Sequence, residues 1–158
     1  MKNIIFILGI ALAIQFSSCS KNDDQVQSSN LVNEVQFIVK DEEGNNLIPN
    51  KYNSETIKLF AEINGEFEEI FDSNLDYPRN FKIAEKDGEN ILSIWPFINE
   101  EEDVSRTLIQ WEEGDVDTLE TSYIKTDNAT ILKEVWFNGD LILSNEENDQ
   151  YIYELSKD

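Results

Sequence analysis

Residues 56–71 read TIKLFAEINGEFEEIF, and this stretch decides the fold class. In its first half, apolar side chains recur at every second position: Ile57, Leu59, Ala61 and Ile63. A period of two places them on one face of an extended strand. Asn64-Gly65 follows, and this pair suits a type I′ turn, in which both central residues have positive φ. The stretch therefore predicts an antiparallel β-hairpin whose return strand covers residues 66–71.

Similar short segments, separated by turn residues, recur along the rest of the chain. Asp87-Gly88 and Asn138-Gly139 predict further hairpin turns, and Tyr77-Pro78 interrupts the chain between two segments. Pro96 cannot donate to a strand ladder, so it is expected at a strand end or a sheet edge. The other strand-like segments cover residues 35–40, 81–85, 90–97, 104–111, 118–125, 130–137, 140–143 and 151–155.

This pattern predicts about eight short strands at roughly ten-residue spacing, which is typical of an all-β sandwich or barrel. We predict a single antiparallel β-sandwich of immunoglobulin-like architecture over residues 34–158. The chain has one cysteine, so the domain lacks the internal disulfide of true immunoglobulin domains.

The charge of the chain excludes several functional classes. The 158 residues include 12 Lys+Arg, 33 Asp+Glu and no His, for a formal net charge of −21. Such a chain repels phosphates, so we predict no nucleic-acid partner. The excess of acid favours basic partners or divalent cations instead. Without histidine the commonest general base is missing, so we predict no enzymatic activity and no cofactor. A carboxylate-dependent enzyme is the remaining catalytic alternative.

The N-terminal residues are predicted to be a targeting segment. Residues 1–18 combine Lys2 with an apolar run over residues 4–14 and then small residues. This run is shorter than the roughly 20 residues that span a bilayer as a helix, so it is typical of a signal peptide. Residues 19–33 are rich in Ser, Asn, Gln and Asp, and we predict that they form a flexible tether.

The segment around the single cysteine resembles a known export pattern. Phe16-Ser17-Ser18-Cys19 resembles a bacterial lipobox, and Ser20-Lys21-Asn22-Asp23-Asp24 resembles the export tag of Bacteroidetes surface lipoproteins. In its whole plan the chain is similar to small Bacteroidetes lipoproteins with one β-rich domain. The resemblance implies cleavage before Cys19, lipid such as palmitate on Cys19, and anchoring in the outer membrane facing the cell exterior. It assigns no other functional residue.

Two acidic clusters are candidate calcium sites, because Ca²⁺ prefers oxygen ligands. The first consists of Asp115, Asp117 and Glu120, of which the first two share a face if the segment is a strand. The second is residues 41–46, which read DEEGNN. Neither has the spacing of an EF-hand. The simpler interpretation is that both are solvated turns, so we predict no bound metal.

Aromatic residues suggest a third kind of site, a platform for sugar rings or for a partner protein. The candidates are Trp95, Trp111, Trp136, Tyr77, Tyr123, Tyr151 and Tyr153. In a sandwich of this size most of them are expected in the core. A coplanar Trp/Tyr pair exposed in a groove would favour glycan binding, whereas a pocket with two carboxylates, one against apolar walls, would favour an enzyme.

The combined prediction is a membrane-anchored, non-enzymatic surface lipoprotein that acts as a binding or interaction module. Its partner, a protein or a glycan, is not identified by the sequence. The alternatives are a carbohydrate-recognition accessory protein of a glycan-uptake system and a carboxylate-dependent enzyme.

Overall fold

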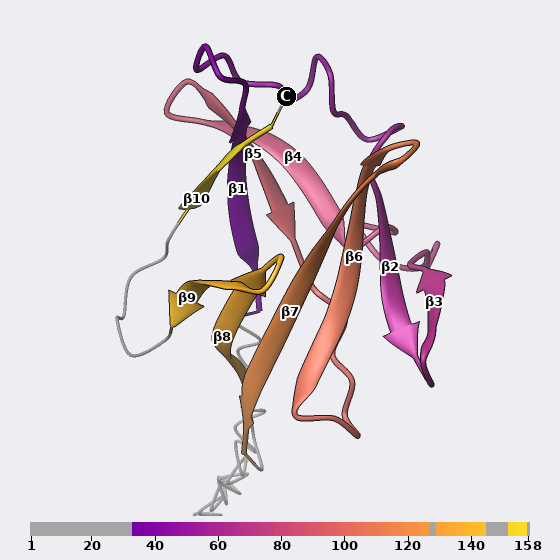
Figure 1. The fold of residues 1–158 in the computed structure, drawn as a ribbon. Helices are drawn as coiled ribbons and strands as arrows, with labels where there is room; N and C mark the ends of the chain where they lie inside the picture. The colour runs from indigo at the N-terminus through magenta and orange to yellow at the C-terminus, as the bar shows by residue number, and fades with distance from the viewer. Residues whose placement is uncertain (1–32, 127–128, 145–151, 158) are drawn as a thin grey trace, which may run out of the picture.

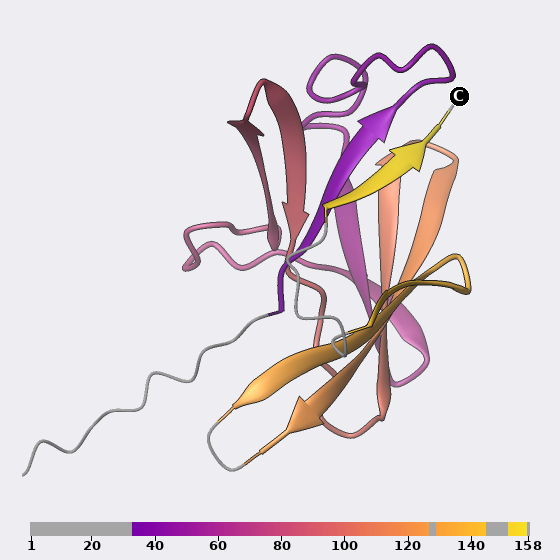
Figure 2. The same cartoon turned by 90° about the vertical axis from the view of Figure 1, so that its left-hand side faces the viewer.

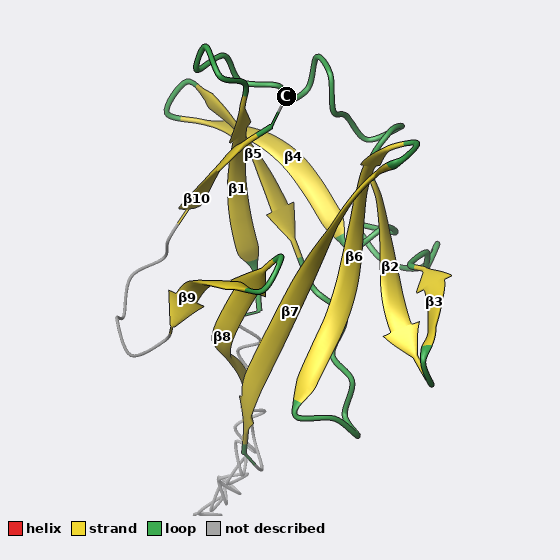
Figure 3. Cartoon of the chain, viewed as in Figure 1, coloured by secondary structure: helices red, strands yellow, loops and turns green. Residues whose placement is uncertain are grey.

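The computed structural model describes residues 33–126, 129–144 and 152–157. These residues form ten β-strands and no helix (Figure 3). The predicted signal peptide and residues 19–32 of the predicted tether, with Cys19, lie outside the described residues, as does Tyr151. Asn33, the last residue of the predicted tether, is buried. Within the described ranges, no helix is long and apolar enough to cross a membrane.

The strands are arranged in two sheets (Figures 1 and 2). The four-stranded sheet has the order β10-β1-β5-β4. Its strands are β1 (Val35–Lys40), β4 (Phe81–Lys86), β5 (Glu89–Ile94) and β10 (Ile152–Ser156). The six-stranded sheet has the order β3-β2-β6-β7-β8-β9. Its strands are β2 (Lys58–Ile63), β3 (Glu66–Glu69), β6 (Val104–Glu112), β7 (Asp115–Lys125), β8 (Thr130–Phe137) and β9 (Asp140–Ser144).

The predicted all-β sandwich is confirmed, with two differences in detail. There are ten strands rather than about eight, because every strand-like segment recognised in the sequence, including the short β3 and β9, pairs as a separate strand. In addition, β10 pairs with β1 in parallel, whereas the prediction was wholly antiparallel. Since β10 follows β9 of the other sheet, no tight hairpin fixes its direction when it adds to the free edge of β1.

The predicted hairpin turns are confirmed by the backbone. Asn64 and Gly65 have φ values of 55° and 82°, and the Asp87-Gly88 and Asn138-Gly139 pairs have the same left-handed conformation. Two successive positive φ values match the right-handed twist of the flanking strands. Pro96 lies just beyond the end of β5, as its missing N–H predicts.

The core lies between the two sheets and is built from alternate residues of their strands. In β1, buried and half-buried residues alternate strictly. Residues from the opposite sheet complete the packing, and several are fully inaccessible: Leu59, Ile109, Trp111, Leu119 and Val135. The loop between β1 and β2 adds Ile48, Tyr52 and Ile57 to the core. The inner faces of both sheets are therefore buried, which leaves their outer faces, edges and loops as the places for a binding site.

Candidate functional site

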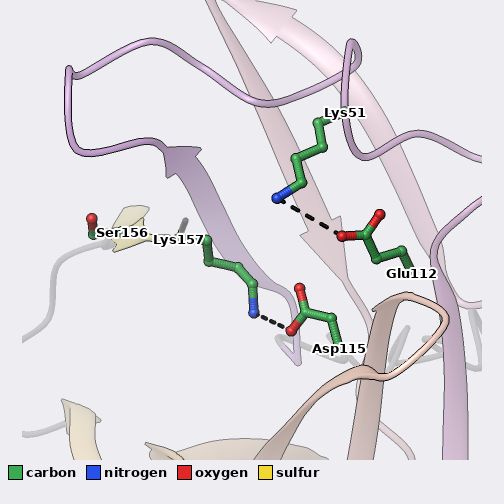
Figure 4. A pocket seen from close by; sticks show the side chains of 5 residues that line it. All are labelled: Lys51, Glu112, Asp115, Ser156 and Lys157. Atoms are coloured by element: carbon green, nitrogen blue, oxygen red, sulfur yellow. Dashed lines mark hydrogen bonds and ion pairs between the residues drawn. The ribbon is translucent and has the colours of Figure 1, made fainter.

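A charged pocket opens at one end of the sandwich, with a volume of about 460 Å³. Figure 4 shows the side chains that line it, Lys51, Glu112, Asp115, Ser156 and Lys157. Lys51 Nζ lies 3.8 Å from Glu112 Oε1, and Lys157 Nζ lies 2.7 Å from Asp115 Oδ1. Each of the two carboxylates in this pocket therefore faces an ammonium group.

Lys157 also connects the end of β10 to the face of β7. Its Nζ lies 2.7 Å from Asp117 Oδ2 as well as from Asp115. Asp117 Oδ2 further accepts a hydrogen bond of 2.7 Å from Trp111 Nε1, and its Oδ1 accepts one of 2.8 Å from Asn138 Nδ2. Only 12% of the Lys157 side chain and 14% of the Asp117 side chain are exposed. We call these five residues the Lys157 network.

Both charges at the centre of the Lys157 network are stabilised by their partners. Burial alone would raise the pKa of Asp117, but hydrogen bonds from Asn138, Lys157 and Trp111 outweigh it and lower the pKa. Burial alone would lower the pKa of Lys157, but hydrogen bonds to Asp115 and Asp117 and their negative charges raise it. Both groups are therefore ionised at neutral pH.

The structure does not bring the first set of calcium candidates together. Asp115 and Asp117 share one face of β7, as their spacing predicts, but the ammonium group of Lys157 binds both. Glu120 lies on the opposite face and binds Arg106, with Arg106 Nη2 at 3.1 Å from Glu120 Oε1. Across the described ranges, no group of three or more acidic, His or Cys side chains is placed to hold a metal ion.

The second calcium candidate, residues 41–46, is a turn in which the Asp41 carboxylate accepts hydrogen bonds from other residues of the same turn. Asp41 Oδ1 accepts hydrogen bonds from the backbone N–H groups of Glu43, at 2.9 Å, and Asn45, at 2.8 Å. The Asn45 side chain donates a third, at 2.9 Å, and is the main cause of the lowered pKa of Asp41. The carboxylate therefore closes the turn, which is a common role of Asp at such positions.

The charged pocket lacks the arrangement that a carboxylate-dependent enzyme requires. A carboxyl that donates a proton at neutral pH needs a raised pKa, which apolar walls and burial provide. Here Glu112 and Asp115 face ammonium groups instead. Elsewhere in the described ranges, the pKa is lowered at four carboxyl groups: Glu34, Asp41, Glu89 and Asp117.

The aromatic candidates separate into residues that pack within the sandwich and one stacked pair near a groove. Trp111 is fully buried, and Tyr153 packs against the rings of Phe37 and Phe137. Trp136 and Tyr123 are half-buried, and burial of the Tyr123 hydroxyl raises its pKa to about 12. The remaining described candidates, Tyr77 and Trp95, lie together.

Tyr77 and Trp95 form a stacked pair beside a groove. Their ring centroids are 5.0 Å apart and their planes differ by 12°, while 43% of Tyr77 is exposed. The adjoining groove has a volume of about 270 Å³. We call it the aromatic groove; its lining residues include Phe71, Asp76, Tyr77, Arg79, Phe81 and Lys82. It lies where the loop between β3 and β4, which projects from the side of the sandwich in Figure 2, meets the edge strand β4.

A tight turn holds Tyr77 against Trp95. The Asn80 N–H donates a hydrogen bond of 2.9 Å to the Tyr77 carbonyl, which closes a four-residue turn with Pro78 in the second position. Proline favours that position because its φ is already fixed. Asn80 has a positive φ of 56°, and its carbonyl accepts a 2.8 Å hydrogen bond from the Trp95 N–H. The turn is thereby attached to the strand end that carries Trp95.

Lys82 lies beside the stacked rings rather than on top of them. Its Nζ is 5.6 Å from the Tyr77 centroid and 5.4 Å from the Trp95 centroid. Because these distances are nearly equal, Lys82 cannot cover the face of Tyr77 that points away from Trp95. That face of Tyr77 is therefore not blocked by Lys82.

Sequence reasoning named Tyr77 and Trp95 only as members of a longer set, and it missed Phe71, Arg79 and Lys82. A usable signal was present, because two cations follow Tyr77-Pro78 closely in a chain with 12 Lys+Arg against 33 Asp+Glu. Lys157 was also missed.

No protein-family model, no curated protein and no solved structure matches the chain.

Proposed function

We propose that this protein is a lipid-anchored, non-enzymatic binding module whose binding site is the aromatic groove and whose ligand is a saccharide. The observation that carries the proposal is the stacked Tyr77–Trp95 pair at the side of that groove, with Tyr77 43% exposed. A stacked aromatic pair whose Tyr77 ring is exposed beside a groove favours glycan recognition over a carboxylate-dependent reaction.

The chemistry of the pair suits a sugar ring. The face of an aromatic ring carries partial negative charge, which attracts the weakly positive C–H groups on one side of a pyranose. Stacking on Trp95 keeps the Tyr77 ring ordered before binding, so that little side-chain entropy is lost when a ligand packs on it. The groove volume of about 270 Å³ lies close to the lower end of ligand pockets, about 300 Å³. It therefore suits a small part of a glycan chain.

In this proposal the lipid on Cys19 holds the protein at the outer membrane, and residues 19–33 separate the domain from the lipid surface. The formal charge of −21 supports this arrangement, because it repels anionic surfaces and keeps the domain in solution. Display toward the cell exterior would give the groove access to extracellular glycans.

The anchor can be tested by metabolic labelling. Cells that express the full chain should incorporate labelled palmitate into it, and Cys19→Ser should abolish the incorporation, because Cys19 is the single thiol of the chain. Exposure on intact cells is measured in parallel by protease accessibility. Equal labelling of the two proteins would refute the lipid anchor.

The groove can be tested with the full chain, purified in detergent, on an array of neutral and acidic oligosaccharides. We expect at least one oligosaccharide to bind, and Tyr77→Ala to weaken it about tenfold, equivalent to about 1.4 kcal/mol. Phe67→Ala is the matched control, because Phe67 is an aromatic residue of similar exposure, 41%, on β3. The proposal is wrong if no oligosaccharide binds or if the two variants behave alike.

A further inference from the structure

We propose that the ligand of the aromatic groove is an acidic saccharide, with its carboxylate or sulfate held by Arg79 and Lys82; this inference rests on the proposed function. Both residues line the groove and are half-buried. Neither has a carboxylate within 4.0 Å in the part of the chain that the structure describes.

These two cations are unusual in such an acidic protein. Most described cations have a carboxylate partner: Lys40, Lys51, Lys58, Arg106, Lys133 and Lys157. Of those without one among the described residues, Lys125 donates to two backbone carbonyls, and Lys86 is exposed near the end of β4. Arg79 and Lys82 are the two that meet at one groove.

Arg79 is oriented in a way that leaves part of its guanidinium group available. Its Nη1 donates a hydrogen bond of 2.7 Å to the Ser54 carbonyl, which fixes one side of the group. An arginine carries five N–H donors in a rigid fork, so the others can bind a planar carboxylate or a sulfate. Because Tyr77, Arg79 and Lys82 line the same groove, a sugar ring packed on Tyr77 has both cations within that groove to bind an acidic substituent.

Two acidic residues, Asp76 and Glu34, lie near this pair of cations. Asp76 is the acidic residue among those that line the groove, so the lining carries an excess of one positive charge. Glu34 interacts with Lys82. Burial would raise the pKa of Glu34, but hydrogen bonds from Ser93 and Gln36 and the charges of Lys82 and Lys86 lower it. Charges farther away than about 8 Å are largely screened at physiological ionic strength. Arg79 and Lys82 thus offer two cations to an anion that enters the groove, in a chain that is otherwise strongly acidic.

The experiment compares three galactose-based trisaccharides that carry no acid group, carboxylates or sulfate. The full chain in detergent is titrated calorimetrically with galactotriose, with trigalacturonic acid and with a sulfated galactotriose. We expect an acidic ligand to bind at least tenfold more tightly than the neutral one. Lys82→Gln and Arg79→Gln should remove that preference by lowering the affinity for the acidic ligand to that for galactotriose. Lys86→Gln is the control, because Lys86 lies on the same strand but does not line the groove.

The outcomes separate this inference from the proposed function. A preference for the uronic acid or for the sulfate supports the inference and identifies the acid group. Equal affinity for all three ligands, with loss of binding in Tyr77→Ala, overturns the inference and leaves a neutral saccharide site. If Lys86→Gln reduces the preference as much as Lys82→Gln does, the effect comes from net charge and the inference is also wrong. No binding by these three saccharides or by any on the array overturns the proposed function as well.

Discussion

Replacement of Trp111 by alanine should lower the free energy of unfolding by about 4 kcal/mol, the middle of the range for a truncated core aromatic. Trp111 is fully inaccessible, and its ring packs against Tyr52 with centroids 5.3 Å apart. The substitution leaves a large cavity between the sheets and also removes the indole N–H that binds Asp117. Urea unfolding followed by circular dichroism measures the loss, and the m value should not change.

Two further variants separate packing from hydrogen bonding. Trp111→Phe keeps a ring in the core but leaves Asp117 without the indole donor, so it should cost about 1–3 kcal/mol. Trp136→Ala is the control, because Trp136 is half-buried on β8 and its loss should cost less than that of Trp111. If Trp111→Ala and Trp136→Ala destabilise the protein equally, packing of Trp111 between the two sheets contributes no more to stability than the half-buried Trp136 does.

Much of the fold could be predicted because the local signals are strong. The pairs Asn64-Gly65 and Asn138-Gly139 specify hairpins through backbone conformation alone, and the structure shows positive φ at all four residues. The alternation in residues 35–40 likewise became a strand with one buried face. The pairing of β1 with β10 could not be predicted, because these are the first and last strands in the sequence of the domain and no tight turn links them.

The site could be predicted only in part, because it depends on contacts between distant segments. Tyr77 and Trp95 are in separate segments, and they meet only because the Asn80 carbonyl accepts a hydrogen bond from the Trp95 N–H. Asp115 and Asp117 were recognised as acids that share a face. Sequence spacing could not show that their cation would be Lys157, which is 42 and 40 residues away. The ammonium group of Lys157 thus binds two of the carboxylates that were considered as calcium ligands.

Replacement of Lys157 by methionine should lower the free energy of unfolding by about 3 kcal/mol at neutral pH, close to the loss seen when one member of a buried ion pair is removed. Methionine keeps an aliphatic stem of similar length, so the change removes mainly the ammonium group. Asp115 and Asp117 would then lie close together without their cation, and β10 would lose its ionic contact with β7.

The pH dependence of this loss distinguishes an ion pair from packing. The folded-state pKa of Asp117 is lowered, so its contribution is complete above 3.8, the ordinary pKa of aspartate, and is lost as the pH falls through the lowered value. The folded-state pKa of Lys157 is raised, so its contribution is complete below 10.5 and is lost as the pH rises through the raised value. The difference in stability between wild type and Lys157→Met should therefore be constant between these limits and shrink outside them.

Lys133→Met is the matched control for the Lys157 measurement. It removes the same charge from a side chain that is 52% exposed and lies 3.3 Å from Glu134, so it should cost less than about 1 kcal/mol. Because the protein is so acidic, loss of any cation increases its self-repulsion, and this control measures that general effect. Equal losses in the two variants would show that Lys157 acts through net charge alone. A loss at Lys157 that persists unchanged in strong acid would show that its stem, and not its bonds to Asp115 and Asp117, holds β10 in place.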